Sequence, residues 1–300
     1  MEVIRLEVIK IEDDRYPSQL RNIKNPPKQL YANGDVSLLK TNIISIIGSR
    51  ACSENGVNLT RKFSKELVYQ GITIASGMAI GIDTIAHRTT LQERGKTIAV
   101  LGNGFKHIFP EENEELYEQI IKNGGLVVTE YSPEVNAESK NFLERNRIVS
   151  GLSLGILVIE AAHRSGTSVT AKLAKEQGKK VFALPHEVND LHGVGTNRLI
   201  KEGAKIVTST GDIIKEFPFL PYKIPPKEKE MKVHSTRKVC ENNEYNEIYQ
   251  WITEKPISLN EIYQKSRKNL VEINHTLLML ELDGYIEKVG GGYRCILDRK

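Results

Sequence analysis

The fold of this chain is decided by residues 140–180, which read KNFLERNRIVSGLSLGILVIEAAHRSGTSVTAKLAKEQGKK. The stretch predicts a buried strand at 156–159, followed by a loop of small residues that opens a helix. Such a loop and helix N-terminus offer unpaired backbone N–H groups and a favourable dipole to phosphate. The stretch also holds three acidic residues and eight basic ones, namely Lys140, Arg145, Arg147, Arg164, Lys172, Lys175, Lys179 and Lys180. It therefore predicts a polyanion site, with a solvated helix face beside an ordinary loop as the alternative.

Outward from this stretch, strands and helices alternate over the first 218 residues. Short apolar runs predict seven strands, at 43–47, 72–75, 97–101, 126–129, 156–159, 181–184 and 205–207. Several of the helical segments between them end in a glycine that can form a left-handed cap, namely Gly71, Gly95, Gly124, Gly178 and Gly203. Strands that are apolar throughout and separated by helices indicate a parallel sheet covered on both faces. We predict an α/β fold with a Rossmann-like, doubly wound, mostly parallel sheet, whose ligands bind at the carboxyl ends of the strands.

The chain of 300 residues exceeds the usual size of one domain. We predict a Rossmann-like core at 1–218 with a short N-terminal extension, a linker at 219–240 and a winged-helix domain at 241–300. The linker contains prolines and carries six basic residues against two acidic ones. In the last domain, helices are predicted at 244–253, 259–265 and 269–282, and a hairpin at 285–289 and 293–296. Ser258 and Glu261 form the pattern of a capping box before the second helix.

The third helix of a winged-helix domain usually reads DNA. Here its predicted exposed positions include Glu272, Glu281 and Asp283, and residues 241–300 hold eight basic and ten acidic side chains. Its apolar side is predicted to consist of Leu270, Ile273, Leu277, Leu278 and Leu280. We therefore interpret the domain as a protein-contact or regulatory module rather than a reader of duplex DNA.

Composition narrows the class of protein. A content of 39% hydrophobic and 27% charged residues is typical of globular proteins. No run approaches the roughly 18 apolar residues of a membrane span, and the first residues lack the order of a secretory signal. Three scattered cysteines have neither the spacing of a disulfide framework nor that of a metal site. We expect a cytoplasmic protein with no membrane segment and no metal.

Three further loops follow predicted strands and belong to the same edge of the sheet. They are residues 48–50, which end in Arg50, residues 76–83 and residues 102–104. Arg50 would be placed to meet a phosphate there. The spacing G-x-x-x-x-G-K-[ST] is absent, so an ATPase is unsupported, and the dinucleotide spacing G-x-G-x-x-G is absent as well.

These segments resemble the DprA/Smf family of bacterial DNA-processing proteins. The motifs are residues 46–50, 76–87, 99–104, Phe142 with 145–153, and 164–167, together with Tyr16-Pro17, 26–27 and parts of 195–204. The resemblance spans residues 16–210 and is weaker through the winged-helix tail. It implies a protein that is not an enzyme, uses no cofactor, binds single-stranded DNA and forms a homodimer. It also implies protection of incoming DNA and loading of the RecA recombinase during natural transformation.

Carried over by position, Arg50 matches the phosphate-contacting arginine of the family, and Lys140, Phe142, Arg145 and Arg147 fall in its DNA groove. Single strands need a basic track for phosphates and an aromatic face for bases. Phe142 would supply that face, the alternative being a core residue. From the basic loop and helix we add to the DNA-binding set Arg164, Ser165, Gly166, Thr167, Lys172 and Lys175.

For other residues of these motifs we expect roles other than DNA contact, or assign none. Asn146 and Glu160 are expected to brace loops internally. Residues 109–113 carry acids where relatives often have a basic residue, so DNA contact is not expected there. His186 follows Pro185 where the family usually has glycine, and the sequence assigns it no function.

Two alternatives belong to other classes of protein. A nucleotide phosphoribohydrolase-like enzyme would use Glu160 beside the loop at 165–167, but no second carboxylate and no paired glycine accompany it. A winged-helix regulator with a nucleotide-sensing core would need a third helix that is less acidic.

Overall fold

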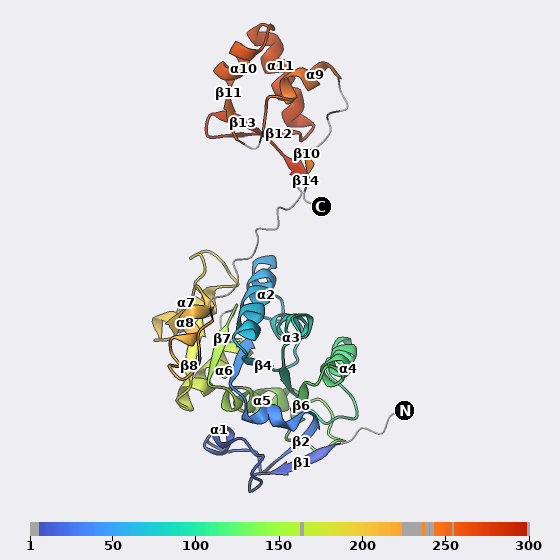
Figure 1. Cartoon of the computed structure of the whole chain (residues 1–300), viewed down its shortest axis with the longest axis vertical. Coiled ribbons are helices and arrows are strands. Elements are labelled where there is room, and N and C mark those ends of the chain that lie inside the picture. The colour runs from blue at the N-terminus through green and yellow to red at the C-terminus, as the bar shows by residue number, and fades with distance from the viewer. Residues whose placement is uncertain are drawn as a thin grey trace. The chain divides into compact units, whose positions relative to one another are not determined.

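The computed structural model describes residues 6–162, 165–223, 236–237, 240, 243–253 and 255–298 of the 300-residue chain. The chain divides into two compact units, Met1–Pro225 and Pro226–Lys300 (Figure 1). Within the predicted linker, residues 224–235 and 238–239 lie outside the described residues. None of the helices in the described part of the chain is long and apolar enough to cross a membrane.

The first unit is built on a nine-stranded sheet with the strand order β1-β2-β6-β5-β4-β3-β7-β8-β9. From β6 across to β9 every neighbouring pair is parallel, whereas β2 and β1 extend the β6 edge in antiparallel pairs. The predicted doubly wound, mostly parallel sheet is confirmed. Its strands are β1 Glu7–Lys10, β2 Gln29–Gly34, β3 Ile43–Ile47, β4 Thr73–Ser76, β5 Thr97–Val100, β6 Leu126–Thr129, β7 Gly155–Val158, β8 Lys180–Ala183 and β9 Lys205–Ile206.

The seven strands predicted from apolar runs are present as β3 to β9, and β1 and β2 were not predicted. Strands β3 to β7 are buried at every residue, which is why their sequences are continuous apolar runs. In β2 only Leu30 and Ala32 are buried, and in β1 only Ile9. These short edge strands therefore lack the signal that identified the others.

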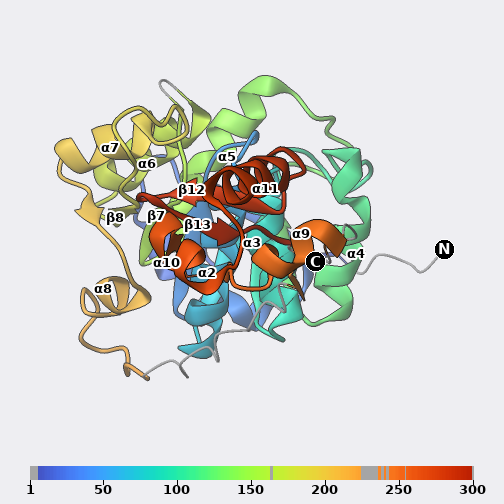
Figure 2. The ribbon, with the colours of Figure 1, turned by 90° about the horizontal axis from the view of Figure 1, so that it is seen from above.

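Helices cover both faces of the sheet. One face packs against α2 Glu54–Tyr69, α3 Ile82–Gln92, α4 Glu114–Lys122 and α8 Thr210–Ile214. The other packs against α1 Ser18–Arg21, α5 Ser139–Leu152, α6 Gly166–Glu176 and α7 Val194–Lys201. Figure 2 shows α5, α6 and α7 on one side of the strands and α2, α3 and α8 on the other. Two short 3₁₀ helices, η1 Val36–Lys40 and η2 Glu111–Asn113, lie in connections.

The predicted left-handed caps are present at four of the five glycines: Gly71, Gly124, Gly178 and Gly203 have φ of 77°, 68°, 69° and 95°. At the fifth position the prediction is wrong, because Arg94 takes the left-handed conformation, with φ of 56°. Gly95 is instead required by space, since a Cβ there would lie 2.5 Å from Cγ2 of Val68.

The second unit has the predicted winged-helix arrangement. Its helices are α9 Asn243–Tyr249, α10 Leu259–Lys265 and α11 Leu270–Leu282, and β12 Ile286–Val289 pairs with β13 Gly292–Cys295. Strand β11 Ile257–Ser258 joins that hairpin, and β10 Thr236–Arg237 pairs with β14 Leu297–Asp298. The capping box is confirmed, because Ser258 N–H donates to Glu261 Oε2 at 2.8 Å and the Glu261 N–H donates back to Ser258 Oγ at 3.3 Å.

The predicted apolar side of α11 is correct for three residues and wrong for two. Ile273, Leu277 and Leu280 are buried in the core of the second unit. Leu270 and Leu278 are exposed to solvent. The helix is therefore apolar on more than one side, which a list of leucines and isoleucines does not resolve.

Candidate nucleic-acid interface

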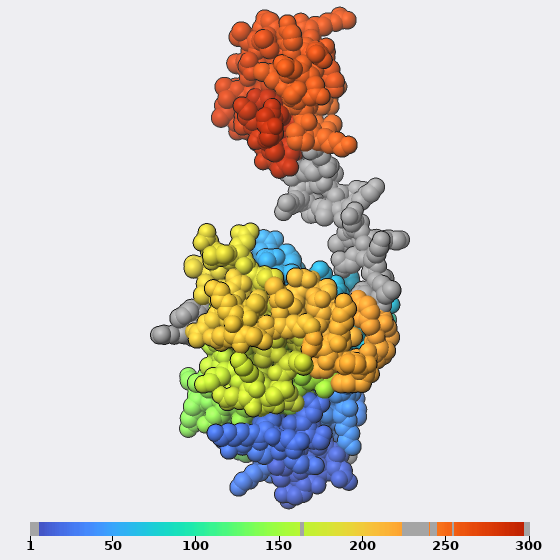
Figure 3. Space-filling view, turned by 90° about the vertical axis from the view of Figure 1, so that its left-hand side faces the viewer, coloured from blue at the N-terminus to red at the C-terminus, as the bar shows by residue number. Residues whose placement is uncertain are grey.

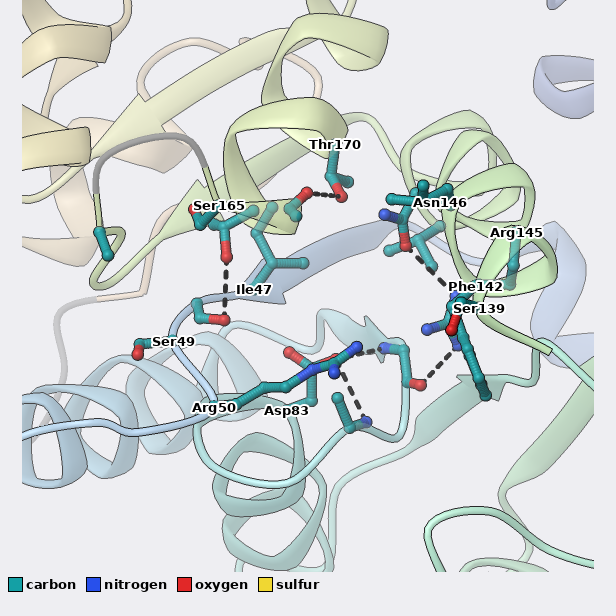
Figure 4. A pocket seen from close by; sticks show the side chains of 18 of the residues that line it. Ile47, Ser49, Arg50, Asp83, Ser139, Phe142, Arg145, Asn146, Ser165 and Thr170 are labelled. Carbon is teal, nitrogen blue, oxygen red and sulfur yellow. Dashed lines mark hydrogen bonds between the residues drawn. The ribbon is translucent and has the colours of Figure 1, made fainter. Parts of the chain in front are cut away.

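A cleft of about 580 Å³ opens where the order of the sheet reverses, between β3 and β7. The chain runs from β3 outward through β4 and β5 in one direction, and later places β7 on the other side of β3. Ligands of doubly wound sheets bind at such a switch point, beyond the carboxyl ends of the strands. The walls come from the loop after β3, the loop after β4, the first half of α5 and the start of α6 (Figure 4).

Arg50 stands on the loop after β3, and its side chain is exposed. Ser49 fixes this loop, because its Oγ donates to the Ala51 carbonyl at 2.9 Å and accepts from the Ala51 N–H at 3.2 Å. In the part of the chain that the structure describes, no hydrogen bond or ion pair engages the Arg50 guanidinium. Figure 4 shows this side chain extending from the loop toward α5. Arg50 is therefore a cation available to a ligand in the cleft.

The small-residue loop of the decisive stretch forms the opposite wall. Ser165 is the N-cap of α6, and its Oγ accepts from the Ser168 N–H at 3.4 Å. Thr167 Oγ1 donates to the Gly48 carbonyl at 3.0 Å, which ties the start of α6 to the loop after β3. A Cβ added at Gly166 would meet open space. The N-terminus of an 11-residue helix thus faces the same cleft as Arg50. Arg164 lies outside the described residues.

Arg145 lines the cleft from α5 but is 4% exposed. Its Nη1 donates to the Gly77 carbonyl at 2.5 Å and to the carbonyl of Val100, at the ends of β4 and β5. Burial lowers the pKa of Arg145 to about 10, and the carboxylate of Asp83 acts in the opposite direction. The donors on Nη1 are thus engaged by the floor of the cleft rather than directed to solvent.

Asp83, at the start of α3, completes this floor. Its Oδ2 accepts from the Gly77 N–H at 3.0 Å and from the Ala79 N–H at 3.4 Å. Burial raises the pKa of Asp83, and the charge of Arg145 opposes that rise. Met78 lies between Gly77 and Ala79, the two residues that Asp83 anchors, and adopts a left-handed φ of 60°. Arg145 and Asp83 thus together hold the first residues of the loop after β4.

Two phenylalanines form a ledge at the rim of the cleft, which we call the Phe109–Phe142 ledge. Their ring centroids are 5.3 Å apart with planes tilted by 37°, and Cζ of Arg145 lies 5.9 Å from the centroid of Phe142. Phe109 is 47% exposed. Aromatic faces of this kind are where bases of single strands stack. Sequence reasoning missed Phe109 because acids follow it, although an aromatic residue after a strand of this sheet was a usable signal.

Two predicted site residues on α5, Lys140 and Arg147, do not line the cleft. Arg147 Nη1 and Nη2 bond to Glu130 Oε1 and Oε2 at 2.8 and 2.6 Å, and both side chains are mostly buried. Lys140 is exposed, and its Nζ lies 3.0 Å from Glu138 Oε2. Lys140 can leave such a surface pair at little cost, because exposed ion pairs contribute about 0–1 kcal/mol. Arg147, in a shielded bidentate pair, is much less available.

Lys172 and Lys175 belong to a second groove of about 1070 Å³, between α6 and α7 and beside β8 and β9. Figure 3 faces this side of the first unit, which α6, α7 and α8 cover in yellow-green to orange. Lys175 Nζ donates to the Glu202 carbonyl at 2.9 Å, and Lys172 lies 3.8 Å from Glu176. Of the residues that the structure describes, Ser165 alone lines both the cleft and this groove. The predicted residues of the small-residue loop and of α6 are thus divided between two places.

Glu160 and His186 serve as braces. Glu160 is fully buried; its Oε2 accepts from the Ser53 N–H at 3.0 Å, and its Oε1 accepts from the Ser53 hydroxyl at the start of α2. The expectation that Glu160 braces a loop is confirmed. His186 contacts Asp190 Oδ2 through Nδ1 at 3.0 Å and the Ile159 carbonyl through Nε2 at 2.9 Å, which ties the loop after β8 to the end of β7. Asn146 Oδ1 accepts from Arg145 Nε at 3.4 Å.

Metal ligation has no support in the described ranges, where no group of three or more His, Cys, Asp or Glu side chains could hold an ion. Among its described residues, the cleft offers one unpaired cation, a helix N-terminus and an aromatic ledge. These suit a ligand that is both anionic and aromatic.

Comparison with known proteins identifies the family. The model described as DNA recombination-mediator protein A matches residues 7–218, and the DprA winged helix domain matches residues 240–292. Protein Smf of Escherichia coli is 36% identical over 286 residues, which are 95% of this chain and 76% of that protein. DNA processing protein DprA of Streptococcus pneumoniae is 43% identical over 209 residues, which are 70% and 73% of the two chains.

Solved structures agree with these relatives. The X-ray structure of DprA from Streptococcus pneumoniae has a TM-score of 0.68 and 41% identity, covering 72% of this chain and 75% of that one. DNA processing protein A from Helicobacter pylori, whose structure concerns its single-stranded DNA binding mode, has a TM-score of 0.64 and 31% identity, covering 71% and 95%. The chain therefore belongs to the DNA recombination-mediator protein A family, whose members include the DNA-processing proteins named DprA and Smf.

Proposed function

We propose that this protein binds single-stranded DNA in the cleft between β3 and β7. The observation that carries the proposal is Arg50, which stands on a fixed loop between the N-terminus of α6 and the Phe109–Phe142 ledge and has no partner among the described residues. A phosphate would sit between Arg50 and the N–H groups of α6. The following base would stack on the ledge, an arrangement that only an unpaired strand can reach.

The second groove would extend this path. A strand that leaves the cleft past Ser165 meets Lys172 and Lys175, which lie on the far side of the same helix. Lys140 would give up its exposed pair with Glu138 for a phosphate. We assign Arg145 a positioning role, because its bonds to Gly77 and Val100 hold the cleft floor without reaching solvent.

Membership of the family supports the wider role. We propose that the protein acts in the cytoplasm as a homodimer, protects incoming DNA and loads the RecA recombinase onto it during natural transformation. It would do so by binding rather than by catalysis. In the hydrolase alternative Glu160 would have to reach a substrate, but its carboxylate is buried and occupied by Ser53.

A salt-dependent binding titration tests the DNA proposal. Fluorescence anisotropy would compare a labelled single-stranded oligonucleotide with its duplex at several salt concentrations. We expect tighter binding of the single strand and a log–log salt slope of about −0.7 for each phosphate contacted. Equal affinity for the two forms at moderate salt would contradict the proposal.

A second experiment tests the delivery step separately. RecA filament formation on single strands covered by a single-strand binding protein would be followed with and without this protein. We expect faster filament nucleation in its presence. If it binds single strands but leaves nucleation unchanged, the delivery role is wrong while the DNA proposal stands.

A further inference from the structure

Helix α11 of the second unit carries an apolar line on its solvent side, which we call the α11 stripe: Val271, His275, Leu278 and Leu282. The apolar members are exposed by 78%, 54% and 71% in that order, and His275 is exposed between them. Successive members are four, three and four residues apart. On a helix with 3.6 residues per turn they fall within a narrow line along one side.

This line is distinct from the side that α11 buries. Ile273, Leu277 and Leu280 pack into the core of the second unit, with Ile248 and Ile262. The 4-3-4 spacing of the α11 stripe is the one by which a helix meets a second helix in a two-stranded seam. The stripe is about 16 Å long at 1.5 Å per residue, enough for three turns of a partner helix.

The charges on α11 point to the kind of partner. Its only Lys, Arg, Asp or Glu residues are Glu272 and Glu281, and Asp283 follows its last residue. Glu272 also accepts from the Asn269 N–H at 3.0 Å, so its place at the start of the helix is fixed. Ahead of the helix, Arg267 is exposed and Lys268 lies 3.7 Å from Glu247. An apolar line between carboxylates opposes a phosphate backbone and favours a helix with basic flanks.

We propose that the α11 stripe docks an amphipathic helix of a partner protein, with an apolar seam flanked by lysine or arginine. A second copy of α11 fits less well, because the only charged residues on that helix are Glu272 and Glu281, so a second copy has no basic group to place beside these carboxylates. The contact is small, so we expect a weak and reversible complex, typical of regulatory encounters.

The test uses the full chain with methyl-labelled valine and leucine. The probe is a synthetic helix with leucines at seam positions and lysines on both flanks, and its counterpart carries glutamates at the flanks. We expect the methyl signals of Val271, Leu278 and Leu282 to shift with the lysine peptide, which should bind at least fivefold more tightly than the glutamate peptide. No shift at millimolar peptide, or equal shifts with both peptides, would overturn the proposal.

Variants connect the signal to the stripe. Leu278→Ser should abolish the shifts, and Tyr263→Ser, an exposed change on α10 rather than α11, should leave them unchanged. Glu281→Lys should reduce the preference for the lysine peptide by severalfold, a readout that needs no loss of apolar surface. Self-association of the free chain that Leu278→Ser removes, or the same shifts with duplex DNA, would identify a different occupant and refute the proposal.

Discussion

The floor of the cleft and the core of the winged-helix unit are stabilised in opposite ways. The floor buries Asp83 and Arg145, and His87 is buried on the same helix as Asp83; all three are less than 10% exposed. Among the described residues of the second unit, no Asp, Glu, His, Lys or Arg side chain is equally buried. The difference teaches that a polar ligand site needs buried polar residues beneath it, whereas an apolar core can lie beneath a polar or an apolar surface. The exposed features differ in the same way. Arg50, which has no partner among the described residues, lies over the charged floor, whereas the α11 stripe lies over the apolar core.

The largest expected effect breaks the charged floor. Arg145→Ala leaves the Asp83 carboxylate buried without its counter-charge, which typically costs about 3–5 kcal/mol. We expect urea denaturation to show a loss of this order in the free energy of unfolding of the first unit. Leu280→Ala provides a matched change in the apolar core of the second unit and should destabilise that unit alone. An Arg145→Ala protein as stable as the parent would show that the floor does not depend on the pair.

Acid should distinguish the two units. His87 is fully buried, with Nδ1 2.6 Å from Thr97 Oγ1, and burial followed by the charge of Arg145 lowers its pKa to about 3. The unfolded chain takes up this proton near pH 6.5, so the stability contributed by neutral His87 is present above that pH and is lost as the pH falls toward 3. We expect a loss of about 2 kcal/mol by pH 5.

The measurement is urea denaturation of the first unit at pH values from 7 to 4, with His87→Gln as the variant. The variant should show a shallower pH dependence, whatever its absolute stability. An unchanged slope would show that His87 does not carry the acid sensitivity.

Arg50 tests whether the cleft is a site rather than a scaffold. Arg50→Ala should weaken single-strand binding by about 1–3 kcal/mol, the scale of a hydrogen bond to a charged group, and leave stability unchanged. Arg61→Ala, an exposed arginine on α2 away from the cleft, is the control and should bind normally. An unaltered binding curve for a folded Arg50→Ala protein would remove Arg50 from the interface.

Lys172 and Lys175 test whether the second groove belongs to the same path. Replacing both by alanine should reduce the magnitude of the log–log salt slope by up to about 1.4, from about 0.7 for each phosphate contact. The affinity should fall equally for different base sequences. A slope equal to that of the parent would confine the DNA to the cleft.

The smallest expected effect comes from deleting the winged-helix unit. Strand β10 pairs with β14 and Cys240 is buried in that unit's core, so the deletion should begin at residue 236. Single-strand affinity should stay the same or rise slightly, because residues 241–300 carry more acidic than basic side chains. A tenfold loss, about 1.4 kcal/mol, would show that this unit contacts DNA despite its charge.

The sequence was sufficient where burial leaves a local pattern. Strands β3 to β7 are buried at every residue, so each is an apolar run, while β1 and β2 bury only one and two of their residues and were missed. The α11 stripe was missed because its leucines are exposed, whereas a leucine in a helical pattern is predicted to be buried.

The site was predictable in its position but not in its contacts. Loops after parallel strands meet at one edge, which placed Arg50 and Thr167 together. The acceptors of Arg145, by contrast, are carbonyls 68 and 45 residues away, and Arg147 pairs with Glu130, 17 residues away. The sequence gives no sign that Arg145 and Arg147 differ from Arg50. Only the fold shows that their guanidinium groups already donate to partners within the protein.

The hydrogen bond from Thr167 to the Gly48 carbonyl joins residues 119 positions apart. The two walls of the cleft are therefore synthesised at different times. While the chain is being made, the loop carrying Arg50 leaves the ribosome long before α6 exists to face it. A nascent chain thus exposes a basic loop without the helix N-terminus opposite, and contact order makes closure of the cleft a late event in folding. The cleft is therefore complete only once most of the first unit has been translated.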